Sequence, residues 1–276
     1  MTTTTEPIET EKEFCPKVMR VRKRNGSLEP VDVNKIVNVV LACSTGLRDV
    51  DPMRVATKVI SGLYDGASTA ELDQLCIQTA SLLIGEEPEY SKLASRLLAR
   101  FIDEEVSSQN IRNFYDSVTV GFENGLISKE KYEWVKEHKE PLNIIIDETR
   151  TRRFEYFGLR TVYDRYLLKH PEQRKVVETP QYFFLRVACG LAKNFEEAKE
   201  FYELISSLDY MTSSPTLFNS ATLRPQLSSC YLLDSPADSL TGIYDKYKDV
   251  ALLSKFAGGI GLSFSRVRSR GSLFQG

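Results

Sequence analysis

The alternation of apolar and polar residues predicts a β-hairpin near the start of the chain. Two β-prone runs, 18–24 and 28–33, flank Asn25-Gly26, a dipeptide that accepts the positive φ angles of a tight turn. From Asn34 onward, apolar residues recur three and four positions apart, the spacing of one buried helix face. We therefore expect a hairpin followed by helices.

Local end signals define three further helices. In "DPMRVATKVISGLYDG", Asp51 is placed to cap a helix whose first residue is Pro52. "STAELDQLCIQTASLLIG" opens with Ser68 and Glu71 at the spacing of a capping box. A fourth helix is expected in "PEYSKLASRLLARFIDEEV". Together with the hairpin, these helices predict a compact unit over residues 17–107.

The pattern changes twice further along the chain. Residues 108–205 stay helical and rich in aromatics, which we interpret as core packing, with Cys189 as a small buried residue. After Leu208 come the β-prone "YMTSSPTLFNS" and "SSCYLLD", a helix-like "SLTGIYDKYKDVALLSKFA", and "GIGLSFSRVR". Strand, strand, helix, strand is the expected start of an α/β domain over residues 206–276. The polar residues 1–16 are expected to be a disordered tail.

Composition and charge limit the classes of partner. The 276 residues are 42% hydrophobic and carry 36 basic against 38 acidic side chains, a net charge of -2. With a net charge this small, the chain has no overall electrostatic attraction to nucleic acid or to an anionic membrane, so a phosphate ligand requires a local site. No apolar run approaches the ~20 residues of a membrane span, and the polar start is unlike a signal peptide. We expect a cytoplasmic protein.

The cysteines favour neither a disulfide framework nor a zinc site. The five are Cys15, Cys43, Cys76, Cys189 and Cys230. Their number is odd, they are widely spread, none forms a C-x-x-C pair, and only His138 and His170 offer imidazole ligands. We expect no metal in this chain.

Charged residues around the hairpin form the first candidate site. Lys23 and Arg24 precede the turn, Glu29 follows it, and Lys35 lies near the start of the next helix. Such a cluster beside a helix N-terminus can hold a triphosphate, because the backbone N–H groups and the helix dipole both favour anions. On spacing alone, a solvated, charged hairpin is the favoured interpretation.

The run "VRKRNGSLEPVDVNKI", with "YDGASTAELD" and "YSKLASRLLARF", closely resembles an ATP-cone domain over residues 17–107. The resemblance implies that the lysines contact the phosphates of ATP or dATP, that the glutamate contacts the adenosine, and that further residues line the pocket. The cone residues that it implies are Lys23, Arg24, Glu29, Asp32, Lys35, Thr69 and Leu72. Asp73 and Glu104 stand where other cones carry basic or imidazole groups, and fewer cations weaken phosphate binding. Loose binding, a preference for ATP over dATP, and either allosteric sign remain open.

The rest of the chain resembles the large (α) subunit of class I or II ribonucleotide reductase. The segments "FGLRTVYDRYLL", "TPQYFFLRVA", "SSPTLFNSATLRPQLSSCYLLD" and "SKFAGGIGLSFSRVRSRGS" carry this resemblance over residues 108–276. It implies a mainly α chain with an α/β part: a cone, a helical N-terminal domain over 108–205, and the first strands of a ten-stranded α/β barrel over 206–276.

The resemblance gives Cys230 a role beyond that of a small buried hydrophobe, the usual reading of a lone cysteine. It implies that this thiol is one of the pair that reduces the ribose 2′-hydroxyl, because a dithiol supplies two electrons as it closes to a disulfide. The implied substrate-binding residues are Ser214, Ser229, Gly258 and Gly259. Closely spaced glycines let backbone approach a ligand, although they also suit a tight packing turn. "GGIGLSF" lacks the spacing of a Rossmann dinucleotide site.

A third set matches the family's specificity site, where a dNTP effector binds at the interface of an α homodimer. Asp238 and Ser239 open the helix after Cys230, at the place where the effector's base and ribose bind. Arg268 matches a cation that reaches the effector's phosphates. Without the resemblance, an Asp-Ser pair at a helix start is only an N-cap.

The resemblance implies radical reduction of ribonucleotides to deoxyribonucleotides under control by ATP and dNTPs. The radical cysteine, the second reducing cysteine, the catalytic glutamate and asparagine, and a C-terminal cysteine pair are expected beyond residue 276. The chain is therefore expected to be inactive alone, as a truncated piece or as half of a split gene.

Several partners are implied. They are the remaining C-terminal part of the α subunit, a second α subunit, thioredoxin or glutaredoxin as reductant, and a radical source that is either a β subunit or adenosylcobalamin. The alternative function is a non-catalytic nucleotide-sensing cone module. A cone-plus-zinc-ribbon regulator is disfavoured, since no cysteine cluster precedes the cone.

Overall fold

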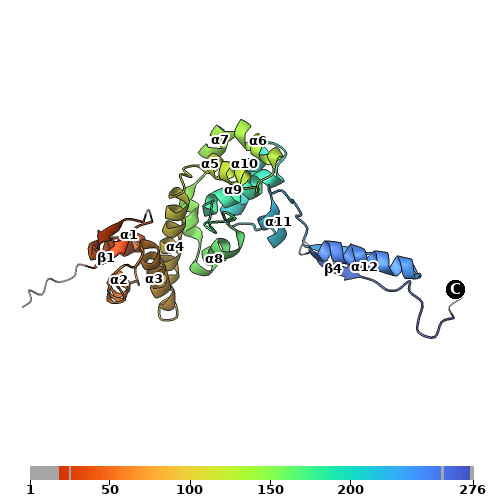
Figure 1. Cartoon of the computed structure of the whole chain (residues 1–276), viewed down its shortest axis with the longest axis horizontal. Helices are drawn as coiled ribbons and strands as arrows, with labels where there is room; N and C mark the ends of the chain where they lie inside the picture. Colours follow the sequence, from red (N-terminus) through yellow and green to blue (C-terminus); the bar gives the residue numbers. More distant parts are fainter. Residues whose placement is uncertain (1–18, 25, 256–257, 274–276) are drawn as a thin grey trace, which may run out of the picture.

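The chain is mostly helical, with two small two-stranded sheets near its ends (Figure 1). The computed structural model describes residues 19–24, 26–255 and 258–273. The predicted tail over residues 1–16 lies outside them. Among the described helices, none combines the length and apolar character needed to cross a membrane.

The predicted hairpin is present. Strands β1 (Arg20–Arg22) and β2 (Leu28–Pro30) pair antiparallel, and Gly26 adopts a φ of 87° in the turn. That angle strains residues with a Cβ, which is why glycine suits the position. Both strands are shorter than the predicted runs, and β2 ends before residue 33 because Asp32 already caps the next helix through a bond from the Asn34 N–H.

Four helices complete the first unit, as the sequence pattern predicts. They are α1 (Val33–Ser44), α2 (Pro52–Ser61), α3 (Thr69–Leu82) and α4 (Tyr90–Ser107). Asp51 caps α2, and Ser68 and Glu71 form the predicted capping box of α3. These helices bury an aliphatic core that includes Val40, Val55, Ile77, Leu93 and Leu98.

A second group of helices packs against α4. It comprises α5 (Phe114–Glu123), α6 (Lys129–Glu137), α7 (Lys139–Ile144), the 3-10 helix η1 (Glu148–Arg153), α8 (Tyr156–Thr161), the π-helix η2 (Val162–Tyr166), α9 (Pro180–Leu191) and α10 (Phe195–Ser206). Helix α4 contacts α8 and η1, so it belongs to both groups (Figure 1). Helix α9 runs through the centre, and Cys189 on it is 1% exposed, which agrees with the predicted core packing.

A buried ion pair ties α9 to the segment that follows α10. The Arg186 guanidinium donates to Glu178 at 2.9 and 3.0 Å, to the Ser220 carbonyl at 2.8 Å and to the Leu217 carbonyl at 3.3 Å. Because both charged groups are nearly inaccessible to water, their mutual hydrogen bonds are required to offset desolvation. The pair therefore fixes the end of α11 (Ser214–Asn219) on the helical body.

One predicted strand is wrong. In "YMTSSPTLFNS", residues 214–219 form helix α11, and none of its residues lies in a strand. Pro215 explains the difference, because it lacks the N–H that a ladder needs and its φ suits the first turn of a helix.

The C-terminal described residues form a βαβ unit. Strand β3 (Cys230–Leu233) pairs parallel with β4 (Gly259–Leu262), and α12 (Leu240–Lys255) makes the crossover. Parallel strands require such a crossover. No residue of α12 is buried, and Figure 1 shows this unit apart from the helical body.

Candidate functional site

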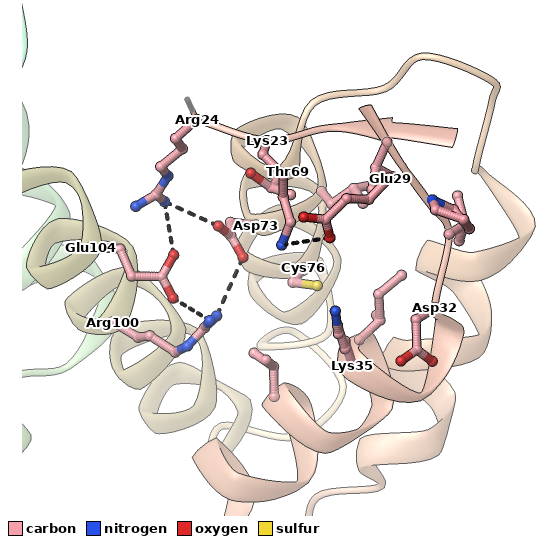
Figure 2. A pocket seen from close by; sticks show the side chains of 16 residues that line it. Lys23, Arg24, Glu29, Asp32, Lys35, Thr69, Asp73, Cys76, Arg100 and Glu104 are labelled. Atoms are coloured by element: carbon pink, nitrogen blue, oxygen red, sulfur yellow. Dashed lines mark hydrogen bonds and ion pairs between the residues drawn. The ribbon is translucent and has the colours of Figure 1, made fainter. Parts of the chain in front are cut away.

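A cavity of about 500 Å³ lies between the hairpin and helices α1, α3 and α4 (Figure 2). All seven residues predicted for the cone line it: Lys23, Arg24, Glu29, Asp32, Lys35, Thr69 and Leu72. They come from separate stretches of the chain, and folding gathers them around one space.

The two lysines approach this cavity from different elements. The Lys23 amino group, at the end of the hairpin, lies 3.6 Å from the Glu29 carboxylate across the turn. Lys35 extends from the first turn of α1, and Figure 2 shows its amino group pointing into the same space. Asp32 lines the cavity but uses its carboxylate to cap α1. Two cations at a helix N-terminus suit the phosphates of a ligand.

A four-residue ionic network closes one side of the cavity (Figure 2). Arg24 Nη2 lies 3.2 Å from Asp73 Oδ2 and 3.1 Å from Glu104 Oε2. Arg100 pairs with both carboxylates as well, and its Nη1 is 3.4 Å from Asp73 Oδ1. Burial and the charge of Glu104 raise the pKa of Asp73, and the two guanidinium groups oppose that rise. The carboxylates therefore neutralise two arginines that face the cavity.

Two of the residues that sequence reasoning missed are Arg100 and Cys76. Arg100 precedes Glu104 by four positions on α4, and this helical spacing was the available signal. Cys76 lies on the cavity wall, but burial raises its pKa to about 12, so its thiol stays protonated at neutral pH. Ile36 and Val39 add apolar wall.

The second candidate site is in the βαβ unit. Cys230 is exposed on β3 and stands opposite Gly259 of β4, whose N–H donates to the Ser229 carbonyl at 2.8 Å. A Cβ at Gly259 would lie 3.3 Å from the Cys230 sulfur, and one at Gly258 would lie 2.9 Å from the Tyr231 ring. Four predicted residues thus lie together, and the glycines also serve close packing.

Ser214 is placed differently from the other predicted substrate residues. It is the first residue of α11, and its Oγ lies 2.8 Å from the Tyr166 hydroxyl. In the part of the chain that the structure describes, no hydrogen bond joins Ser214 to Cys230. Tyr166, at the end of η2, was missed by sequence reasoning, because nothing in its local pattern points to a residue 48 positions away.

The residues predicted for a specificity effector lie near one another. Arg268 Nε donates to the Asp238 carboxylate at 2.6 Å, and Nη2 reaches the Asp238 carbonyl at 3.3 Å. The Ser239 hydroxyl accepts from the Gly242 N–H at 3.1 Å, as an N-cap of α12 would. A bound anion would have to compete with Asp238 for this guanidinium.

Within the described ranges, no group of three or more His, Cys, Asp or Glu side chains is arranged to hold a metal ion.

Comparison with known families gives three matches in chain order. Residues 19–105 match the ATP cone domain, 152–225 the ribonucleotide reductase all-alpha domain, and 228–276 the ribonucleotide reductase barrel domain. The fold class inferred from the sequence is confirmed by this order.

Curated relatives agree with the three matches. The ribonucleoside-diphosphate reductase large chains of Cryptosporidium parvum and Neurospora crassa are each 40% identical over 266 residues, which is 94% of this chain and 33% and 28% of theirs. The large subunit from Plasmodium falciparum is 38% identical over 264 residues, 94% of this chain and 32% of its own. The chain thus spans about a third of the length of these relatives. It belongs to the ribonucleotide reductase large-subunit family, of which it carries the N-terminal region: an ATP cone, the all-alpha domain and the start of the barrel domain.

Proposed function

We propose that the chain is the nucleotide-sensing N-terminal part of a ribonucleoside-diphosphate reductase large subunit, and that its cone binds ATP or dATP as an allosteric effector. The observation that carries this proposal is that all seven predicted cone residues line one and the same cavity. The match to the ATP cone domain supports the same ligand class.

Each wall of the cavity suits one part of a nucleotide. Lys23 and Lys35 take the phosphates, helped by the N-terminus of α1. Ile36 and Leu72 offer apolar surface to the base, while Glu29 accepts hydrogen bonds from the nucleoside. Binding exchanges the Lys23–Glu29 pair, which is partly exposed and therefore weak, for contacts to the ligand.

The βαβ unit would contribute a reducing thiol. Cys230 is exposed and pairs with a glycine, so a ribose can approach its sulfur. In the proposed reaction, two thiols close to a disulfide and supply two electrons and two protons, and the 2′-hydroxyl leaves as water while hydrogen takes its place. The second thiol and the radical cysteine would come from the remaining part of the large subunit. Ser214, Ser229, Gly258 and Gly259 would hold the substrate.

The proposed partners follow from this function. The curated relatives are named as large chains or subunits, which favours a small β subunit over adenosylcobalamin as the radical source. Thioredoxin or glutaredoxin would reduce the disulfide again. A second large subunit would complete the dNTP specificity site around Asp238, Ser239 and Arg268.

The cone assignment is tested by calorimetric titration of ATP into the chain. Replacing Lys35→Ala removes a charge-assisted contact to phosphate, so we expect ATP to bind roughly tenfold more weakly or worse. Lys58→Ala is the matched control, because Lys58 lies on α2 and does not line the cavity. Equal affinities in parent and Lys35→Ala, or no binding to the parent, would exclude the assignment.

The reductase role is tested by mixing the chain with a polypeptide that carries the remaining barrel and measuring deoxyribonucleotide formation. We expect turnover with the parent, and none with Cys230→Ser in the presence of an external reductant, because a hydroxyl cannot form a disulfide. Nucleotide binding without turnover by any such mixture would favour the alternative, a non-catalytic nucleotide-sensing module.

A further inference from the structure

A second cavity, larger than the first, lies between the cone and the helical body. Its volume is about 920 Å³, within the range of small-molecule sites. One wall comes from α1 and α4 of the cone, and the other from η1, the start of α9 and the residues that follow α4. Arg100 lines both cavities, so the two are neighbours that share part of α4.

The floor of this cavity is built from ordered, buried groups. Val106 and Ile111 are nearly inaccessible to water, and so are Thr151, Thr179 and the ring of Tyr182. Aliphatic surface and an aromatic ring, with hydroxyl groups beside them, suit a ligand that has a planar ring and polar substituents.

Arginines occupy the rim. Arg96 Nη1 donates to the carbonyls of Cys43 and Thr45 at 3.0 and 2.7 Å, which holds the guanidinium in place at the end of α1. Among the described residues, no ion pair is made by Arg96, Arg112 or Arg152. Arg112 and Arg152 are exposed at the cavity; Arg112 lies in the segment between α4 and α5, and Arg152 lies on η1. Guanidinium groups match phosphate oxygens through paired N–H donors.

Two carboxyl groups share the cavity, and both have raised pKa values. Although Asp103 and Glu148 retain contact with water, the surrounding protein raises the pKa of Asp103 to about 6 and that of Glu148 to about 7. Glu104 and Asp147 add to these shifts, and the Asp103 charge acts on Glu148.

Other charged or titratable side chains line the same cavity as this pair. They are Arg96 and Arg100 on α4, Cys43 on α1, Arg112 and Arg152 on the opposite wall, and Tyr182 on α9. When the carboxyls are protonated, the cavity is dominated by arginine charge and can donate hydrogen bonds to an anion.

We propose that this interdomain cavity is a second binding site for a phosphorylated, ring-bearing anion of nucleotide size, held by Arg96, Arg112 and Arg152 over the Tyr182 floor. The site is separate from the cone cavity and does not depend on the proposed function. Phosphates would lie at the arginine rim, and the ring would lie on the apolar floor.

Calorimetric titration of ATP into the full chain tests the proposal. We expect two ATP molecules per chain. Arg112→Ala combined with Arg152→Ala should weaken the second site at least tenfold and leave the cone site unchanged, because two charge-assisted contacts are lost. Arg165→Ala is the matched control, since Arg165 is exposed and lines neither cavity.

ATP binding at the cone site checks that the double variant is folded, and Lys35→Ala should weaken binding only at the cone site. If Lys35→Ala has no effect while the double arginine variant loses a site, the cone assignment fails and the second site stands. A single ATP per parent chain, or two unchanged sites in the arginine variant, would overturn the proposal.

Two further titrations define the ligand class. Inorganic tripolyphosphate should bind the second site more weakly than ATP, because it lacks a ring; equal affinity would overturn the ring-bearing class. Lowering the pH from 8 to 6 should strengthen ATP binding to the parent more than to Asp103→Asn/Glu148→Gln, in which the carboxyls are already neutral. Protonation of ATP itself affects the parent and the variant equally. The same change of ATP affinity with pH in the two proteins would therefore contradict a site containing Asp103 and Glu148.

Discussion

At the scale of single residues, neighbours decide what a charge can do. Lys23 and Arg24 are adjacent in sequence, yet Lys23 faces the cavity beside Glu29, whereas Arg24 lies against Asp73, Glu104 and the Phe101 ring. The cone cavity is lined by as many carboxylates as cations. Lys23 and Lys35 can therefore bind phosphate, whereas Arg24 links α3 to α4 through its ion pairs with Asp73 and Glu104.

We predict that Asp73→Asn tightens ATP binding to the cone. Removing this carboxylate leaves Arg24 and Arg100 with one acceptor fewer and raises the charge beside the cavity by one. At a distance of several ångströms and an intermediate dielectric, one added charge favours binding of the ATP phosphates by about 1 kcal/mol, which is a roughly fivefold gain in affinity. Asp49→Asn, an exposed change in the same unit, is the control. Calorimetry measures the effect, and weaker binding in Asp73→Asn would contradict it.

The environments of the cysteines also differ, and they decide which thiol can react. Burial raises the pKa of Cys76 and of Cys189, whereas Cys230 is exposed. Because the thiolate is the reactive form and needs access, we expect a limiting amount of iodoacetamide at pH 8 to modify Cys230 well before Cys76 and Cys189. Peptide mass spectrometry gives the order, and early labelling of Cys189 in the folded chain would contradict this placement.

At the scale of elements, close approach fixes how α9 meets the segment after α11. A Cβ at Gly190 would lie 2.0 Å from the Ser220 Oγ and 2.4 Å from the Ala221 amide nitrogen. The Ser220 hydroxyl donates to the Val187 carbonyl, and Arg186 donates to the Ser220 carbonyl. Helix α9 thus positions the chain that leads from α11 to Cys230.

We predict that Gly190→Ala destabilises the protein by about 1–3 kcal/mol or more, since the added methyl group overlaps backbone that cannot move without breaking these bonds. Gly85→Ala is the control, because nothing lies within 4 Å of a Cβ there and its φ is not positive. Denaturant unfolding measures both. Equal midpoints for the two variants would show that α9 and the 217–221 segment are not closely packed in solution.

At the scale of the whole molecule, burial is uneven along the chain. The cone and the helical body share one continuous core through α4, which also forms walls of both cavities. The βαβ unit has two strands, open sheet edges and a helix with no buried residue. Tyr244, Leu252 and Phe264 are exposed on it.

Hydrogen exchange should reflect this difference. We expect amides of β3, α12 and β4 to exchange faster than those of α3 and α4, because few buried contacts oppose local opening of the unit. Exchange followed by mass spectrometry on the parent chain tests this. Uniform protection across the two regions would mean that the βαβ unit is closed and independently stable.

The sequence by itself determined the features that depend on neighbouring residues. The hairpin turn at Gly26, the caps at Asp51 and Ser68, and the order of the three parts were all predicted correctly. The cone residues could be named because a motif places them at fixed spacing, and the structure brings them to one cavity.

Only the tertiary structure decided the remaining features. Pro215 was a local helix signal in "YMTSSPTLFNS", but the anchoring of the end of α11 by hydrogen bonds from Arg186 to the Leu217 and Ser220 carbonyls is a tertiary feature. The pairing of Tyr166 with Ser214, the neutralising of Arg24 by Asp73 and Glu104, and the interdomain cavity join residues tens of positions apart. Local pattern carries no information about such pairs, because their energies arise from burial and charge proximity that exist only after the helices have packed.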